Sequence, residues 1–154
     1  MKRRIEIGGG RNPHRKKEGY INIDDNSGPT VDIVRNVLRG LPFDDSSVDE
    51  IYMCHVLEHL PNGPDMVFFI NELYRVLKNK GILEIIVPHS ITPEAFNPLH
   101  LSYWNERSFD FFGKDYTKTV EDTGINVNFR LIKKRFPDMR YSRISLYLKF
   151  EAIK

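Results

Sequence analysis

The residues with the clearest chemical potential lie near the N-terminus, where one short apolar run ends in glycines and the next ends in acids. The first run covers residues 4–7, and the second covers residues 20–24, ending in Asp24 with Asp25 after it. The glycines are Gly8, Gly9 and Gly10. Glycine lets a backbone approach a ligand closely, and an acid at the tip of a second strand can accept hydrogen bonds from both ribose hydroxyls. The combination predicts a nucleoside site, although two simple turns remain the alternative.

The neighbouring residues indicate which nucleoside cofactor suits such a site. The dinucleotide fingerprint requires a further glycine where this chain has Pro13, and it places a helix N-terminus against the pyrophosphate. Residues 11–19 offer no apolar face that a helix could bury. A phosphate loop is excluded as well, because no Gly-Lys-Ser/Thr follows the glycines. S-adenosylmethionine carries a nucleoside without phosphates, so it would need no such helix.

The elements that must position these residues are mostly strands. Seven runs rich in Ile, Val or Tyr are bounded by turn-forming residues. The predicted strands cover 4–7, 20–24, 31–34, 48–54, 82–87, 127–136 and 144–153. The run 82–87 carries Glu84 as its only charge, which is typical of a parallel strand buried on both faces. The last two runs alternate, and their short connection through 137–142 predicts an antiparallel hairpin.

Helices are expected in far fewer places. Residues 64–80 place apolar side chains at helical spacing, with Pro64 at the first helical position and Gly81 just past the end. A shorter helix is predicted from Asn105 to a stop at Gly113. The first connection has no apolar residue, the second is too short for a helix, and Gly40 and Pro42 oppose a full-length helix in the third. The sequence therefore predicts an α/β fold with a reduced set of helices.

The chain as a whole resembles the class I S-adenosylmethionine-dependent methyltransferases, especially their small members. The matching stretches are IEIGGGRNP, GYINIDD, LPFDDSSVDEIYMCHVLEHL and ELYRVLKNKGILEIIVPH, which together cover most of residues 4–113. The resemblance implies a Rossmann-like, mostly parallel seven-stranded sheet with an antiparallel C-terminal strand pair. It also implies S-adenosyl-L-methionine as the cofactor and methyl transfer as the reaction.

The same resemblance implies roles for the N-terminal residues. Glu6, Gly8 and Gly10 match the motif that holds the methionine end of the cofactor through backbone groups and bound water. Gly9 stands where the family more usually has a cysteine. Asp24 matches the ribose-binding acid. These residues are expected to line the methyl-donor site.

Further cofactor contacts are expected at the next strand ends. Asp25 directly follows the ribose-binding acid, and Asn36 stands where the family often has an aspartate that contacts the adenine. An asparagine can accept a hydrogen bond from the adenine amino group, and Val37 could pack on the purine ring. Cys54 and His55 end the fourth strand, close to the expected methyl group.

The acceptor is expected beside the long segment that follows residue 88. This segment carries His89, His100, Tyr103 and Trp104, and loops at this edge of a sheet commonly form acceptor pockets. The aromatic residues could equally cap the core. A histidine can take a proton from an attacking hydroxyl or amine near neutral pH, so His55 and His100 are the candidate catalytic bases.

The pattern His55-Val-Leu-Glu-His59 has the form H-x-x-E-H, which also occurs in some zinc peptidases, so it raises the question of a metal site. On a helix the two histidines would share one face. However, the segment begins at a strand end and Pro61 interrupts any helix, while Glu72 and His89 are the remaining third-ligand candidates. No metal site is predicted.

The length and composition of the chain limit the possible folds, partners and locations. The 154 residues contain 40% hydrophobic and 29% charged residues, which fits one globular domain over 1–154 and excludes a barrel of ~250 residues. The single cysteine allows no internal disulfide, and a net charge of +2 argues against a nucleic-acid partner. No run resembles a signal peptide or a membrane span of ~20 residues, so a cytoplasmic location is expected.

Three functions remain in competition at this point. The first is a methyltransferase acting on an unidentified acceptor by direct displacement, and the second is a non-catalytic module that only binds S-adenosylmethionine. An NAD-dependent oxidoreductase is opposed by Pro13 and the missing helix. Because the first crossovers contain so little helix, one sheet face should be thinly covered. This suggests self-association across that face.

Overall fold

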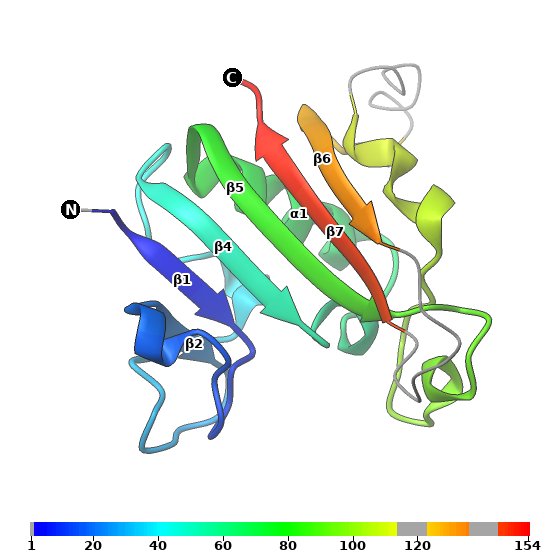
Figure 1. Cartoon of the computed structure of the whole chain (residues 1–154), viewed down its shortest axis with the longest axis horizontal. Helices are drawn as coiled ribbons and strands as arrows, with labels where there is room; N and C mark the ends of the chain where they lie inside the picture. Colours follow the sequence, from blue (N-terminus) through cyan, green and yellow to red (C-terminus); the bar gives the residue numbers. More distant parts are fainter. Residues whose placement is uncertain (1, 114–122, 136–144) are drawn as a thin grey trace.

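The computed structural model describes residues 2–113, 123–135 and 145–154 and contains one seven-stranded sheet of order β3-β2-β1-β4-β5-β7-β6 (Figure 1). The strands are β1 (Arg4–Ile7), β2 (Ile21–Asp24), β3 (Ile33–Val34), β4 (Val48–Cys54), β5 (Leu77–Pro88), β6 (Phe129–Arg135) and β7 (Ser145–Ala152). β1 to β5 pair in parallel, whereas β7 runs antiparallel to both β5 and β6. The predicted fold class is confirmed.

The helical content is as low as the sequence predicts. The described residues form one α-helix, α1 (Pro64–Val76), and short 3-10 helices. The 3-10 helices are η1 (Lys16–Glu18), η2 (Val37–Arg39), η3 (Leu57–His59), η4 (Pro93–Phe96) and η5 (Glu106–Phe112). The predicted connection of the last two strands at 137–142 lies outside the described residues, but the antiparallel pairing of β6 with β7 is confirmed.

The end of α1 differs from the prediction. The helix stops at Val76, and Leu77 turns into extended backbone (φ −68°, ψ 140°) to pair with Val48 in the sheet. Leu77 is fully buried, so its place in the sheet outweighs the helical spacing of the next residues. Gly81 is no helix cap. A Cβ there would lie 2.9 Å from the Lys78 carbonyl oxygen, so glycine permits a close approach within an irregular part of β5.

The second predicted helix exists, but as the 3-10 helix η5. Asn105 caps it, since its Oδ1 accepts hydrogen bonds from the backbone N–H groups of Arg107 (2.9 Å) and Ser108 (3.1 Å). Gly113 adopts an extended conformation (φ −92°), which any residue could adopt. Phe109 and Phe112 face inward as predicted and are buried among other aromatic rings.

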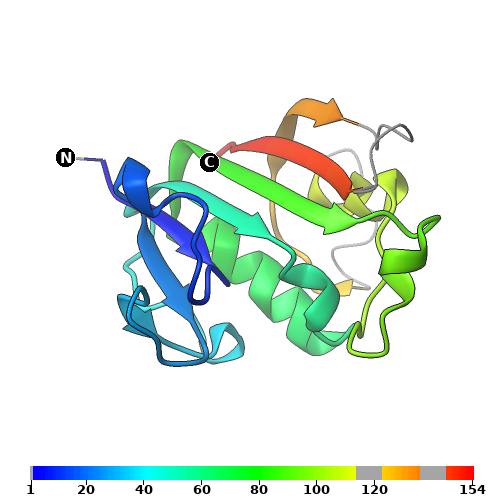
Figure 2. The same cartoon turned by 60° about the horizontal axis from the view of Figure 1, so that its bottom comes forward.

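The two faces of the sheet differ in what covers them. α1 packs against one face with Met66, Phe69, Ile70, Leu73 and Val76 buried, and Figure 2 shows it beneath β4 and β5. The opposite face of β4, β5 and β7 is turned toward the viewer in Figure 1 and carries no helix of the described segments. One face therefore holds the core, and the other is open.

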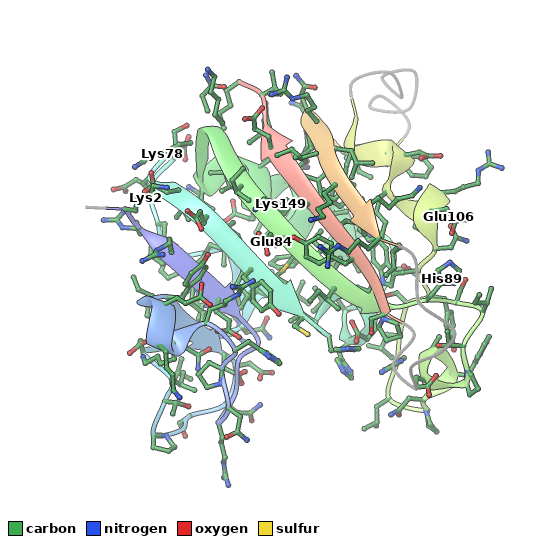
Figure 3. All side chains as sticks on the ribbon, viewed as in Figure 1. Lys2, Lys78, Glu84, His89, Glu106 and Lys149 are labelled. Carbon is green, nitrogen blue, oxygen red and sulfur yellow. The ribbon has the colours of Figure 1, made fainter. Side chains whose placement is uncertain are left out.

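The open face is polar rather than apolar, which corrects the expectation that the run 82–87 is buried on both sides. β5 alternates, with Leu83 and Ile85 fully buried and Glu84 half-buried on the open face. Glu84 accepts hydrogen bonds from Lys149 of β7 (2.7 Å) and from Arg15 (3.4 Å), and Figure 3 shows Glu84 beside Lys149. These ion pairs let the face contact water.

Within the three described segments, no helix is both long and apolar enough to span a bilayer.

Candidate functional site

A cavity of about 450 Å³ lies at the carboxyl ends of β1, β2, β3 and β4. Parallel strands end at this edge together, so residues far apart in the sequence meet there. Six of the predicted cofactor residues line the cavity: Gly8, Asp24, Asp25, Asn36, Val37 and His55. Residues from separate sequence motifs thus meet at one cavity.

The turn after β1 needs glycine for two physical reasons. Gly8 has a φ of 74°, in the left-handed region, and a Cβ at this position would lie 2.5 Å from Cγ2 of Val56. Gly10 also has a positive φ, 51°. Any side chain at Gly8 would close the gap between the turn and Val56, which also lines the cavity. The backbone forms a cradle here because it lacks side chains.

Asp24 both borders the cavity and organises the glycine turn. Its Oδ2 accepts a hydrogen bond from the Gly10 N–H (2.9 Å), and its Oδ1 accepts one from the Asn26 N–H (3.0 Å). A carboxylate offers about four acceptor positions, so further hydrogen bonds to a ligand remain available. The fixed orientation suits an acid that must receive two hydroxyls.

Glu6, Gly9 and Gly10 lie beside the cavity rather than on its wall. Glu6 is 1% exposed, and its two oxygens accept hydrogen bonds from the backbone N–H groups of His14 and Arg15, each at 2.7 Å. Glu6 therefore holds the chain that follows the glycines. A Cβ on Gly9 would lie 2.4 Å from Asn22 Oδ1, and Gly10 lines a neighbouring hollow with Asp24.

The segment after β3 forms the next part of the wall. Asn36 caps η2 by accepting a hydrogen bond from the Leu38 N–H (2.9 Å), and buried Val37 follows it. Arg35 and Leu38 also line the cavity and were not predicted. Their position directly after a strand end is the signal that could have found them.

His55 is the titratable group best placed at the cavity. It follows β4 with a φ of 58°, a conformation uncommon outside glycine. Its Nδ1 lies 2.8 Å from Oε1 of Glu58, and its Nε2 lies 3.3 Å from the Ser145 hydroxyl oxygen. Because the carboxylate accepts, the geometry favours a hydrogen on Nδ1 and a lone pair on Nε2. The neighbouring Cys54 is not among the residues that line the cavity.

The predicted acceptor residues divide into two groups. His89 is 6% exposed and lies outside the cavity. Its Nε2 is 2.9 Å from Oε2 of Glu106, and its Nδ1 accepts from the Ile91 N–H. Figure 3 labels His89 and Glu106 in the same part of the molecule. Trp104 is 5% exposed and donates its indole N–H to Ser102. Both are part of the packed interior.

Tyr103 and His100 belong to the second, more accessible group. Tyr103 is 51% exposed and packs against Phe96 with ring centroids 5.3 Å apart. His100 places its ring 4.8 Å from that of His59, and His59 lines the cavity. His59 is not among the cofactor or acceptor residues predicted from the sequence, so its place on the cavity wall was missed.

Part of this chain is similar to known methyltransferases. Residues 15–85 match a family model described as "Methyltransferase domain". A probable S-adenosylmethionine-dependent methyltransferase of Mycolicibacterium smegmatis is 31% identical over 99 residues, which is 64% of this chain and 37% of that protein. One of Mycobacterium tuberculosis is 35% identical over 77 residues, covering 47% of this chain and 27% of its own. The matched region thus spans between about a quarter and little more than a third of the length of these curated relatives.

Solved structures share the fold over nearly the whole chain. A SAM-dependent methyltransferase from Archaeoglobus fulgidus superposes with a TM-score of 0.67 at 16% identity, covering 98% of this chain and 86% of that one. Another, from Aquifex aeolicus, gives a TM-score of 0.65 at 17% identity, with 99% and 85% covered. At these identities the likeness concerns the arrangement of the sheet.

Proposed function

We propose that this chain is an S-adenosylmethionine-dependent methyltransferase, which binds this cofactor in the cavity beside Gly8 and Asp24 and transfers its methyl group to an acceptor. The proposal rests on the position of Asp24. It ends β2, borders the cavity and is held by the Gly10 N–H (2.9 Å), as a ribose-binding acid must be.

The wall of the cavity suits each part of this cofactor. Asp24 would accept the ribose hydroxyls, Asn36 and Val37 would contact the adenine, and the cradle at Gly8 would receive the methionine end. Asp25 borders the ribose position and is exposed. S-adenosylmethionine supplies an electrophilic methyl group on a sulfonium, and methyl transfer leaves S-adenosylhomocysteine.

The protein's contribution to the reaction is mainly alignment, which can supply ~7–11 kcal/mol. His55 is the residue that would take the acceptor's proton, at Nε2, as the acceptor's lone pair forms its bond to carbon. Glu58 orients the ring through its hydrogen bond to Nδ1 (2.8 Å). A general base of this kind contributes a factor of ~10²–10⁴. This pair disfavours the non-catalytic alternative, because a binding module needs no oriented base.

The acceptor would approach from the segment 90–103. Its exposed side chains are largely apolar, which favours an acceptor with an apolar part. They are Ile91 (69%), Phe96 (63%), Leu99 (73%), Leu101 (54%) and Tyr103 (51%). His100 lies at the inner end of this surface beside His59, while His89 and Trp104 would support the segment from below.

Calorimetry tests the proposed site. S-adenosylhomocysteine should bind the chain, NAD should not, and Asp24→Ala should weaken binding by about tenfold or more. Asp44→Ala, at an exposed position away from the cavity, is the matched control. Tight binding that survives Asp24→Ala would contradict this location. Transfer of a labelled methyl group from S-adenosylmethionine to candidate acceptors then separates an enzyme from a binding module.

The expected cytoplasmic location and self-association across the open sheet face stay predictions. The ion pairs of Glu84 with Lys149 and Arg15 favour contact with water over a second copy. Light scattering at micromolar concentration decides the matter, and a monomer would contradict self-association.

A further inference from the structure

Three side chains of types that can bind metal ions lie close together, and one of them, His59, lines the cavity. Glu58 and His59 come from η3, and His100 comes from the segment after β5. One ligand atom from each residue lies within 4.8 Å of the others. The rings of His59 and His100 meet edge to face, at 83° with centroids 4.8 Å apart. The three residues thus share one small volume.

The Glu58 carboxylate is the observation that points to a bound cation. The residue is 1% exposed, and its Oε2 has no hydrogen-bond partner among the described residues, although Oε1 contacts Nδ1 of His55 (2.8 Å). A buried carboxylate oxygen without a partner is costly. A metal ion at Oε2 would satisfy it.

Both histidines are oriented as metal ligands usually are. Nδ1 of His100 lies 3.0 Å from the Ala95 carbonyl oxygen, and Nδ1 of His59 lies 3.4 Å from the Leu99 carbonyl oxygen. A carbonyl can only accept, so the hydrogen of each ring is placed on Nδ1 and the lone pair on Nε2. Metal-binding histidines typically donate their second nitrogen to a backbone carbonyl in this way.

Backbone hydrogen bonds hold the two segments together. The Glu58 carbonyl oxygen accepts from the N–H groups of Leu101 (2.7 Å) and Ser102 (3.2 Å), and the Ser102 hydroxyl donates to the Leu57 carbonyl oxygen (2.8 Å). His100 is adjacent to these anchors. The three ligands are therefore positioned by structure that exists without an ion.

We propose that Glu58, His59 and His100 bind one divalent transition-metal ion of the zinc class. Two imidazoles and one carboxylate suit such ions and leave a coordination position open for water. Tetrahedral zinc needs its ligand atoms about 3.3 Å apart, which rotation of the partly exposed histidines can supply. The site differs from the His55–His59 pair considered and rejected from the sequence, because His55 is directed at Glu58 and the third-ligand candidates Glu72 and His89 pair elsewhere.

Zinc binding can be measured without cofactor or acceptor, so the result is independent of the proposed methyl transfer. The untagged chain, treated with a chelator and dialysed, is titrated with Zn²⁺ in a calorimeter. We expect one equivalent to bind, and His59→Ala and His100→Ala each to weaken binding by more than about tenfold. His14→Ala, an exposed histidine outside the cluster, should bind as the parent does.

A spectroscopic measurement guards against a variant that fails to fold. Co²⁺ added to the parent chain should give visible absorption typical of low coordination number, and equimolar Zn²⁺ should abolish it. Unchanged far-ultraviolet circular dichroism in His59→Ala shows that lost binding reflects the lost ligand. The proposal is overturned if the parent binds no zinc equivalent, or if binding persists unchanged in both histidine variants.

Discussion

The buried carboxylate of Glu58 holds the exposed imidazole of His55, with Oε1 and Nδ1 2.8 Å apart and side-chain exposures of 2% and 47%. The pair spans the turn that follows β4, where His55 has a positive φ. Glu58 thus secures Nδ1 of a ring that lines the cavity, while Nε2 lies 3.3 Å from the Ser145 hydroxyl oxygen. This arrangement controls which nitrogen can accept a proton.

Removing the charge of Glu58 should impair turnover more than cofactor binding. In Glu58→Gln the His55 ring loses a charged partner, so we expect kcat to fall by about tenfold or more with little change in affinity for S-adenosylhomocysteine. His55→Asn, which tolerates the left-handed backbone, should lower kcat at least as much. Steady-state kinetics with the acceptor checks both, and an unchanged kcat in His55→Asn would remove His55 from the reaction.

A methyl group on Gly8 should damage the site and the fold together. Gly8→Ala places its Cβ 2.5 Å from Val56 Cγ2 in a left-handed conformation, so a loss of about 1–3 kcal/mol in unfolding free energy is expected. Gly28→Ala is the control, since its Cβ would meet only ordinary contacts at 3.6 Å. Urea denaturation and calorimetry with S-adenosylhomocysteine report the two effects. Equal behaviour of the two variants would contradict the close approach.

The strands and the residues that gather at their carboxyl ends could be predicted because their signals are local. Short β-rich runs ending in Gly8 or Asp24 specify both a strand and the residue at its tip. The features that could not be predicted depend on packing between residues far apart in the sequence. Leu77 leaves the helical pattern because Val48 offers it a buried place in the sheet. Glu58 looks like a surface residue in sequence and is buried because residues 101–102 bond to its carbonyl oxygen.

Glu72 should link stability to acidic pH. Its hydrogen bond with Arg75 (2.9 Å) lowers the pKa of the Glu72 carboxyl, as does the Leu41 N–H. Because the folded-state pKa lies below the unfolded value, this stabilisation is present above about pH 4.3 and is lost as the pH falls through the folded-state pKa.

The variant that tests this linkage is Glu72→Gln. It should lower the unfolding free energy by about 1 kcal/mol at neutral pH, and its unfolding free energy should fall less steeply than that of the parent as the pH becomes acidic. Glu94→Gln, at an exposed position in η4, should change neither. Thermal unfolding followed from pH 3 to pH 7 measures the effect. A parallel shift of the whole curve would count against the linkage.

Tyr20 should make the stability of the fold fall as the pH rises into the alkaline range. Burial raises the pKa of its hydroxyl, and donation to Glu50 (2.6 Å) raises it further. With the folded-state pKa above the unfolded value, the contribution is complete below about pH 10 and is lost as the pH rises toward the folded-state pKa. Tyr20→Phe should therefore show a shallower loss of stability above pH 10 than the parent, in denaturant titrations. Tyr103→Phe, at an exposed position, should follow the parent curve.

The polar side of the sheet has a consequence for solution behaviour. A bare apolar sheet invites stacking of one molecule on another, and folds of this class usually prevent it with a second helical layer. In this structure the charged side chains of Glu84, Lys149 and Arg15 oppose such stacking, because it would remove water from all three charges. A sheet face without a helical layer can thus stay in contact with water, with its hydrated charges in the place of that layer.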